Sequence, residues 1–198
     1  MTQKAAPVAG ADEPVPAVKR TPWALFPILI GLPDIEIEIQ ADRRLAFEVL
    51  TAFGASQGSE GSSRVLFRDG ERLLVEFRVP VRGLLGIQQT FRTVEWVTLQ
   101  APNQIDSEGV TGPLPLLRDR FTLEERGACT KFRYQSTFGV RGWIPGWLVG
   151  MLYVRPTMKR FMRNHAEEVK QTIEARAARC KIYPQRLCHE EPTLEPAQ

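Results

Sequence analysis

A long amphipathic pattern near the C-terminus, from Trp147 to Arg179, constrains the fold of this chain more than any other feature. Its apolar residues fall within one arc of roughly 140° on a helical wheel, so one side of the predicted helix should be buried. Pro156 removes a backbone donor and should kink or split the helix near Tyr153. The part from Thr157 onward would be about 35 Å long, which is the width of about seven adjacent strands. One helix can therefore cross the whole face of such a sheet.

The chain before this helix contains the strands that the sheet needs. In residues 34–40 isoleucines alternate with acidic residues, which is typical of a strand with one solvent-facing side. Asp42 is a suitable N-cap for a helix that runs to Phe53, and Asp69-Gly70 predicts a tight hairpin turn. Further strands are expected at residues 64–68, 72–81, 87–99, 104–111, 116–125 and 129–140. The predicted order is one strand, one helix, six strands and the long helix.

The chain length and the composition of its ends predict one folded domain between two loose ends. A length of 198 residues fits a single domain with some trimming, at about 150 residues per domain. Residues 1–22 are rich in Ala and Pro and are expected to be a disordered leader, followed by an apolar arm at residues 23–33. The expected domain spans residues 34–183, and residues 184–198 are expected to form a flexible tail.

Charge, cysteine and histidine content argue against several classes of protein. The chain has no apolar run long enough to span a membrane, and no basic stripe with interleaved aromatic residues that would indicate nucleic-acid binding. Its three cysteines form no CxxC pair and it has only two histidines, which argues against a disulfide scaffold and a metal site. We therefore expect Cys180 and Cys188 to be ordinary thiols in a cytoplasmic protein without a cofactor.

The predicted element order resembles the helix-grip fold of the START-like (SRPBCC) superfamily. The matching segments are the first strand and helix, at residues 35–53, and the Pro/Gly/Trp-bearing turn that leads into the long helix, at residues 143–174. The resemblance is closest to the polyketide cyclase/dehydrase and lipid-transport group, which includes coenzyme-Q-binding proteins. It implies an α+β fold in which a curved, seven-stranded antiparallel sheet wraps around the C-terminal helix. It also implies a cavity between sheet and helix that holds a hydrophobic or amphipathic ligand.

Side chains that should face one another across this cavity are the candidate ligand-binding residues. They are Phe77, Phe91, Phe132, Tyr134, Phe138, Met151, Arg155, Met158 and Met162. Plain core packing is the alternative for each aromatic residue, and methionine suits either a core or an adaptable pocket.

Polar residues within the apolar pattern allow a sharper hypothesis. An unpaired buried arginine is costly, so Arg155 should pair with an acid, meet a polar ligand group or reach solvent at the helix break. Glu76, Glu95 and Asp119 are its potential partners, and Asp119 is the natural one if its side chain points inward. Asp119 and His165 are also the weak candidates for catalysis, although His165 fits equally well as a histidine of the core or its rim.

Two functions remain open at this point. The first is non-enzymatic binding or transport of a hydrophobic small molecule, such as a lipid, an isoprenoid quinone or a polyketide-like compound. The second is a cyclase or dehydratase in which Tyr134, Arg155, Asp119 or His165 supplies proton transfer and orientation. No nucleophile and base pair is evident, which favours binding over catalysis.

Peripheral membrane contact is a possible addition to the first function. The apolar segments Trp23 to Ile30 and Trp143 to Trp147 carry tryptophans, which favour membrane interfaces. Basic residues on the outer side of the long helix would attract anionic lipid. The alternative is that the arm covers an edge or an end of the sheet.

Overall fold

The computed structural model describes residues 27–54, 62–82, 88–114, 116–140 and 144–183, together with Cys188. The expected leader, residues 23–26 of the apolar arm, Trp143 and most of the expected tail lie outside the described residues.

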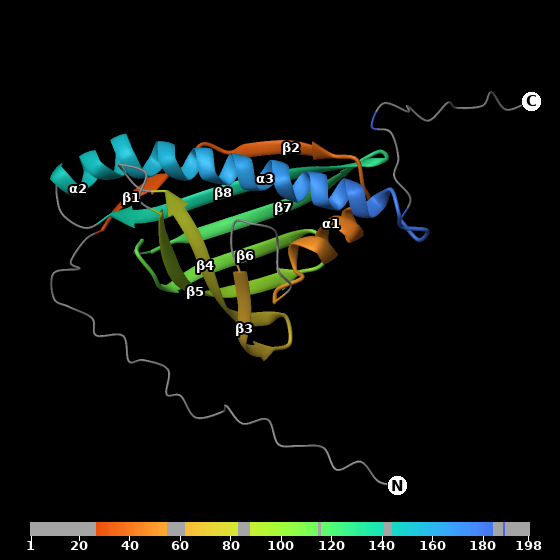
Figure 1. The fold of residues 1–198 in the computed structure, drawn as a ribbon, viewed down its shortest axis with the longest axis horizontal. Coiled ribbons are helices and arrows are strands. Elements are labelled where there is room, and N and C mark those ends of the chain that lie inside the picture. The colour runs from red at the N-terminus through yellow and green to blue at the C-terminus, as the bar shows by residue number, and fades with distance from the viewer. Residues whose placement is uncertain are drawn as a thin grey trace, which may run out of the picture.

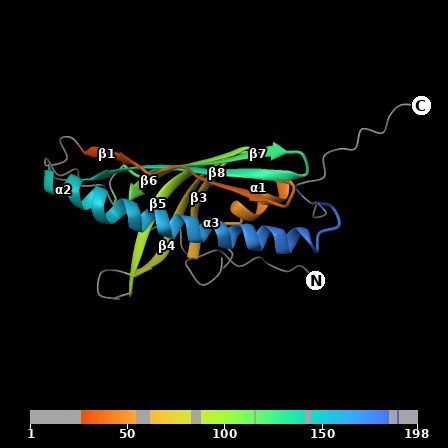
Figure 2. The same ribbon diagram turned by 90° about the horizontal axis from the view of Figure 1, so that it is seen from above.

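One antiparallel sheet of eight strands forms a layer of the described fold. Its spatial order is β1-β8-β7-β6-β5-β4-β3, and β2 also pairs with β8. The strands are β1 (Ile28–Gly31), β2 (Ile35–Ile39), β3 (Ser62–Asp69), β4 (Arg72–Arg82), β5 (Gln88–Gln100), β6 (Gln104–Thr111), β7 (Arg118–Arg126) and β8 (Cys129–Val140). The long helix α3 (Arg155–Ala177) crosses one face of this sheet (Figures 1 and 2). The predicted α+β helix-grip architecture is confirmed.

Strand β1 is the one that the sequence pattern did not predict. Its residues from Ile28 to Gly31 pair with β8 from Val140 back to Thr137, and β2 pairs with the part of β8 nearer its start. The two short strands therefore occupy successive parts of the same edge of β8. Part of the expected apolar arm belongs to the sheet.

The alternation of side chains along β8 follows the prediction, and one hairpin differs from it. Phe132 and its alternate neighbours up to Phe138 are buried, whereas the residues between them are half-buried. In the β3–β4 hairpin Asp69 pairs with Arg72, so the two loop residues are Gly70 and Glu71, one position later than predicted. Gly70 has a φ of 57°, a conformation that glycine adopts without steric cost.

The C-terminal helical segment is interrupted where Pro156 predicts it. Helix α2 (Ile144–Val149) continues into a π-helical turn, η2 (Gly150–Val154), and α3 follows with Pro156 in its first turn. Val154 and Arg155 keep helical dihedral angles, so the helical backbone continues into α3, and the π-helical turn before Pro156 accommodates its missing donor. At Gly150 the helix approaches the sheet closely, since an added Cβ would lie 2.5 Å from Ile30 Cδ1.

The far end of α3 packs in a dry core with helix α1 (Arg43–Leu50) and β2. Asp42 caps α1 as predicted, with its Oδ1 accepting a hydrogen bond of 2.7 Å from the backbone N–H of Arg44. Ile39, Leu45, Leu123, Ile173 and Ala177 are all buried here, and we call these five residues the closed end. The Glu174 carboxylate accepts a hydrogen bond of 2.9 Å from the backbone N–H of Gln40.

Candidate functional site

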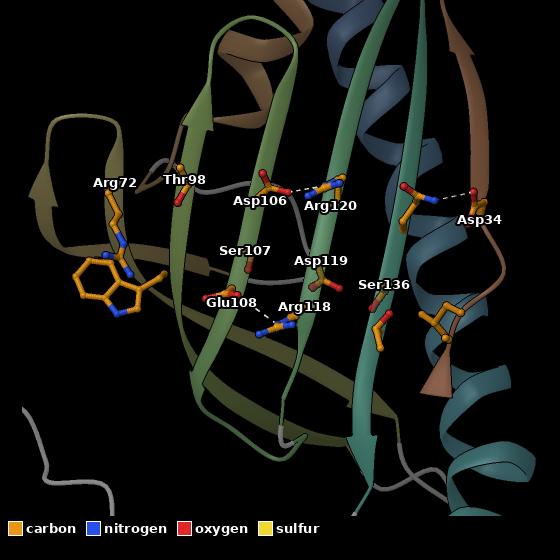
Figure 3. A pocket seen from close by; sticks show the side chains of 15 residues that line it. Asp34, Arg72, Thr98, Asp106, Ser107, Glu108, Arg118, Asp119, Arg120 and Ser136 are labelled. Carbon is orange, nitrogen blue, oxygen red and sulfur yellow. Dashed lines mark hydrogen bonds and ion pairs between the residues drawn. The ribbon is translucent and has the colours of Figure 1, made fainter. Parts of the chain in front are cut away.

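A row of polar side chains crosses the inner face of the sheet, the face that α3 covers. In the strand register Ser107 of β6 stands opposite Asp119 of β7, and Asp119 stands opposite Ser136 of β8. Glu95 of β5 and Tyr134 of β8 lie on the same face, at the two ends of this line. Figure 3 shows Ser107, Asp119 and Ser136 on three adjacent strands. We call these five residues the polar row.

Hydrogen bonds link the polar row into two groups. The Glu95 carboxylate accepts hydrogen bonds from the hydroxyls of Ser107 and Thr93, the latter at 3.0 Å. The Tyr134 hydroxyl donates to Asp119 Oδ1 at 2.9 Å. Glu95, Ser107 and Tyr134 are all buried, and Asp119 is half-buried. Two carboxyl groups therefore lie within one low-dielectric region.

Burial shifts the proton equilibria of these groups in the same direction. Loss of hydration raises the pKa of Asp119 to about 7, and the nearby charge of Glu95 adds to the increase. Desolvation also raises the pKa of Glu95, and it raises the pKa of Tyr134 well above 10.0. Among the described residues no basic side chain lowers the pKa of either carboxyl group. The row can therefore hold an exchangeable proton near neutral pH.

One hydroxyl of the row lacks a partner. Ser136 is 5% exposed, and its Oγ makes no hydrogen bond of standard geometry with any described residue. It nevertheless lies close enough to Asp119 and Tyr134 to lower the pKa of both. A buried hydroxyl without a protein partner is rare, and such a group commonly finds its partner in a bound ligand or an ordered water molecule.

Several of the apolar candidate residues are only partly buried, and some of them lie on the first half of α3. Arg155 Nε donates to the carbonyl oxygen of Gly31 at 3.2 Å, and Gly31 pairs with Thr137, next to Ser136. The beginning of α3 therefore lies beside the polar row. The half-buried candidates come from two parts of the fold: Phe77 and Phe91 lie on β4 and β5, and Met151, Met158 and Met162 lie on η2 and the first half of α3. We call these five residues the open end, and the Phe77 ring within it stands edge-on to Phe53 at a centroid distance of 6.0 Å.

The remaining aromatic candidates belong to the packed core. Phe132, Tyr134 and Phe138 are each at most 3% exposed. The Tyr134 ring contacts Phe121, with ring centroids 5.0 Å apart, and its hydroxyl faces Asp119. Tyr134 thus serves the core with its ring and the polar row with its oxygen, as buried tyrosines usually do.

The expected pairing of Arg155 with Asp119 is wrong. Arg155 bonds to the Gly31 carbonyl oxygen, and the carboxylate of Asp119 is bonded by Tyr134. Glu76, another expected partner, points to the outer face, where Arg78 and Arg92 neutralise it. The third, Glu95, is bonded by hydroxyls. The interruption of the helix before Arg155 turns this side chain toward β1, whose position the sequence pattern did not predict.

His165 lies half-buried on α3, with its ring stacked on that of Phe161 at a centroid distance of 6.3 Å. Asp119, the other candidate for catalysis, accepts a hydrogen bond from Tyr134 on β8. Sequence reasoning did not assign Ser107 and Ser136 to the site and considered Glu95 only as a partner for Arg155. Their signal was the alternation itself, since each is a polar residue on the apolar side of its strand.

The outer face of the sheet carries an open hollow of about 660 Å³ (Figure 3). Its charged lining is largely paired internally, because Arg120 bonds to Asp106 at 2.7 Å and Arg118 to Glu108 at 3.3 Å. The guanidinium of Arg72 lies 4.4 Å from the centre of the Trp96 ring. These charged groups are therefore paired with one another, and Ser107, Asp119 and Ser136 of the polar row also belong to the lining of the hollow.

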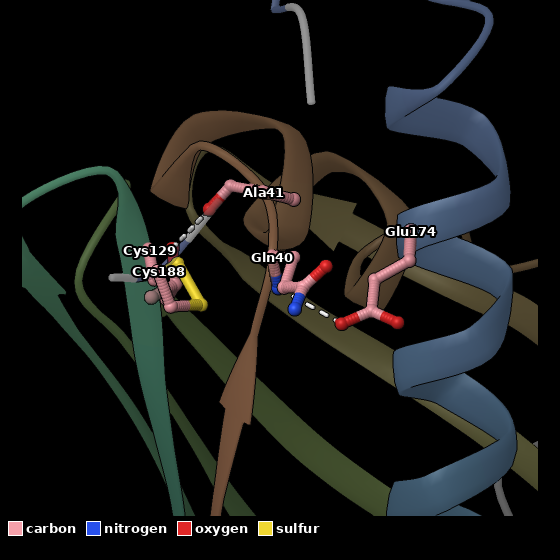
Figure 4. The surroundings of a disulfide bond; sticks show 6 residues. Gln40, Ala41, Cys129, Glu174 and Cys188 are labelled. Carbon is pink, nitrogen blue, oxygen red and sulfur yellow. Dashed lines mark hydrogen bonds between the residues drawn. A yellow bond between two sulfur atoms is a disulfide. The ribbon is translucent and has the colours of Figure 1, made fainter. Parts of the chain in front are cut away.

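A disulfide between Cys129 and Cys188 corrects the expectation of ordinary thiols (Figure 4). The start of β8 and the segment after α3 meet at the same end of the molecule, which brings together cysteines 59 residues apart. Cys180 is a free thiol, as expected. Within the described residues no group of His, Cys, Asp or Glu side chains could hold a metal ion.

Helix α2 and the turn η2 expose an apolar surface beside β1. We call it the apolar end patch, and its members are Leu29, Ile144, Trp147, Leu148, Val149, Leu152 and Tyr153. Soluble monomers rarely expose such a concentration of large apolar side chains. No helix in the described part of the chain is both long and apolar enough to cross a membrane.

Comparison with known proteins finds solved structures with a similar fold, but no match to the sequence among family models or curated proteins. No protein-family model and no curated protein matches the sequence. The solved structure of TTHA0849 from Thermus thermophilus is similar, with a TM-score of 0.62 and 15% identity over 74% of this chain and 99% of that one. The Zhui aromatase/cyclase from Streptomyces sp. R1128 is similar with a TM-score of 0.60 and 15% identity, over 78% and 98% of the two chains. A START superfamily protein from Mycobacterium smegmatis has a TM-score of 0.59 and 17% identity, over 74% and 97%.

Proposed function

We propose, from the premise that this chain has the START-like helix-grip fold, that it binds or transports a hydrophobic small molecule between the sheet and α3. The observation that carries the proposal is the partial exposure of Phe77 and Phe91, on the same face of the sheet as buried Val75, and of Met158 and Met162 on the helix that crosses the sheet. Apolar side chains that face an interior are normally buried, and these leave surface for an apolar guest. Lipids, isoprenoid quinones and polyketide-like compounds are the candidate ligands.

The chemistry of the open end suits a ligand with a loosely defined apolar body. Methionine side chains are flexible and polarizable, so Met151, Met158 and Met162 can adapt to different shapes. The polar row beside them supplies a few fixed hydrogen-bonding groups, which orient a ligand within an otherwise apolar site. Binding of this kind requires neither a metal nor a cofactor.

A neutral apolar fluorophore, N-phenyl-1-naphthylamine, tests this proposal on the full chain. We expect the probe to bind, and the variant Met158→Trp, which fills the open end, to weaken binding at least about tenfold. The matched control is Leu152→Trp, which adds the same ring at a position that is 75% exposed. Absence of probe binding, together with absence of lipid in extracts of the purified protein, would contradict the proposal.

A cyclase or dehydratase is the second candidate function. The observation that favours it is the Asp119–Tyr134 hydrogen bond, because a carboxyl group with a pKa of about 7 can both donate and accept a proton at neutral pH. An aromatase/cyclase is also among the structurally similar proteins. Incubation with a linear poly-β-ketone thioester should then yield a cyclised product, detected by mass spectrometry. Unchanged yields with Asp119→Asn and His165→Ala would remove both residues from the mechanism.

Peripheral membrane contact through the apolar end patch is a further part of the proposed function. Lys159, Arg160 and Arg163 follow the patch along α3, and each could contribute about 1 kcal/mol near an anionic lipid surface. We expect the full chain to sediment with phosphatidylserine-containing vesicles and Leu152→Glu to reduce this binding. The control Phe67→Glu changes an equally apolar exposed residue on β3. Equal loss in both variants, or no binding to any vesicle, would contradict this part.

The state of the cysteines bears on the compartment in which we propose that the protein works. Disulfides persist in oxidising compartments, so the Cys129–Cys188 bond supports such a compartment over the cytoplasm predicted from the cysteine pattern. Alkylation of the denatured protein from its own cells without a reductant distinguishes the two. One labelled thiol supports an oxidising compartment, and three labelled thiols support the cytoplasm.

A further inference from the structure

The polar row combines two features that together restrict which ligand it accepts. Glu95 and Asp119 bring two carboxyl groups to the interior, and Ser136 adds a buried hydroxyl that lacks a partner. We infer that the row recognises the hydroxyl group of an amphipathic alcohol or phenol and excludes a carboxylate. The inference rests on the proposed binding of a hydrophobic molecule at the open end, and it names the polar group of that molecule.

The first step concerns the unpartnered hydroxyl. Ser136 lies on β8, next to Asp119 on the neighbouring strand, and its carbonyl oxygen accepts a hydrogen bond of 2.9 Å from the backbone N–H of Leu32, which follows β1. A buried hydroxyl that lacks a hydrogen bond is destabilising relative to one that is satisfied. A ligand oxygen that accepts from Ser136 Oγ would remove this destabilisation.

The second step concerns the carboxyl group beside it. Asp119 Oδ1 already accepts from Tyr134, and Ser136 approaches the same carboxyl group closely enough to lower its pKa. A carboxylate has two oxygens and can accept further hydrogen bonds beside these. A ligand hydroxyl can accept from Ser136 with its oxygen and donate its proton to Asp119. An alcohol or a phenol satisfies both groups with a single atom, which a ketone or an ether cannot do.

The third step concerns charge. The row itself contains only acidic and neutral groups. From the facing helix, Arg155 is bonded to the Gly31 carbonyl oxygen and His165 stacks on Phe161. Neither side chain is among the causes that shift the pKa of Asp119 or Glu95. An ionised ligand carboxylate would lie next to two acids whose pKa no basic side chain lowers, and it would repel them in a region of low dielectric constant.

A matched pair of ligands tests the inference on the full chain at pH 8. Dodecan-1-ol and dodecanoic acid share an apolar body and differ in head group, and each is titrated against bound N-phenyl-1-naphthylamine. We expect the alcohol to displace the probe at a concentration at least about tenfold lower than the acid does, since an unpaired buried charge is far costlier than a neutral group. Equal or tighter displacement by the acid would overturn the inference.

Two variants show whether the row is responsible. Ser136→Ala should weaken the alcohol about fivefold and leave the probe unchanged, whereas Thr137→Ala, its neighbour on the outer face of β8, should alter neither. Asp119→Asn should reduce the difference between the concentrations of alcohol and of acid that displace the probe. A purely structural role of Asp119 would leave this difference unchanged. Unchanged discrimination in both variants overturns the inference while leaving the proposed function intact. Failure of the probe itself to bind overturns both.

Discussion

The two halves of α3 face the sheet in different ways. Toward its C-terminal end Ile173 and Ala177 are at most 1% exposed and pack against α1 and β2. Toward its beginning Met158 and Met162 remain half-buried, beside a row of desolvated polar groups. One continuous helix therefore packs tightly against the fold with one half and stays partly exposed with the other, where we propose that a ligand binds. The comparison teaches that the burial of apolar side chains differs between the two halves of a single helix.

The largest expected effect is at the closed end. Ile173→Ala removes a fully buried side chain from a packed core, and we expect the free energy of unfolding to fall by about 3 kcal/mol. Urea denaturation followed by circular dichroism measures this change. A loss below about 1 kcal/mol would show that the closed end is as loosely packed as the open end.

The next largest effect is a pH-dependent gain in stability when Asp119 of the polar row is replaced. The pKa of Asp119 is about 7 in the folded protein against an ordinary value of 3.8, so the folded state binds more protons between these values. Stability therefore falls as the pH rises from about 4 to about 7. The full shift corresponds to about 4 kcal/mol, and because the side chain is half-buried we expect Asp119→Asn to gain about half of that at pH 8.

Thermal denaturation at pH 4 and at pH 8 separates this effect from packing. The difference between Asp119→Asn and the unmodified chain should be small at pH 4 and large at pH 8. A difference that is the same at both pH values would mean that the Asp119 carboxyl group is solvated.

A smaller effect is expected where the closed end begins. Asp42→Ala removes the N-cap of α1 and should lower the free energy of unfolding by about 1 kcal/mol. Asp42→Ser restores a capping oxygen and is the control in the same denaturation experiment. If both variants lose equally, the cap does not stabilise α1.

The smallest effect is expected from the helix residue at the open end. Met158→Ala should lower the free energy of unfolding by less than about 1 kcal/mol, since a half-buried side chain leaves little cavity behind when it is truncated. Comparison with Ile173→Ala under the same conditions gives the contrast directly. A cost as large as that of Ile173→Ala would show that the first half of α3 is ordinary core.

Features with a short-range cause were predictable from the sequence. Pro156 lacks a donor wherever it stands, and Asp42 caps the residues that directly follow it, so both predictions are confirmed. The Asp119 side chain also points inward as its neighbours indicated. The side-chain periodicity of β8 likewise follows from the strand itself.

Features that depend on distant register were not predictable. The partner of Arg155 is a backbone oxygen of β1, a strand too short to give a pattern. Cys129 and Cys188 meet only because β8 and the end of α3 lie at the same end of the fold. The alignment of Ser107 with Ser136 through Asp119 requires two strand registers, and neither residue signals it alone.

The attachments of α3 have a consequence for how such a binding site can change. At one end Arg155 holds the carbonyl oxygen of Gly31, and at the other Glu174 holds the backbone N–H of Gln40. Both bonds join a side chain of the helix to a main-chain atom. That main-chain atom is still present when Gly31 or Gln40 is replaced by another residue. The helix is therefore fixed by its termini, and substitutions between them can alter ligand preference without moving it. Directed evolution confined to the facing positions between these two anchors should yield new ligand preferences on an unchanged scaffold.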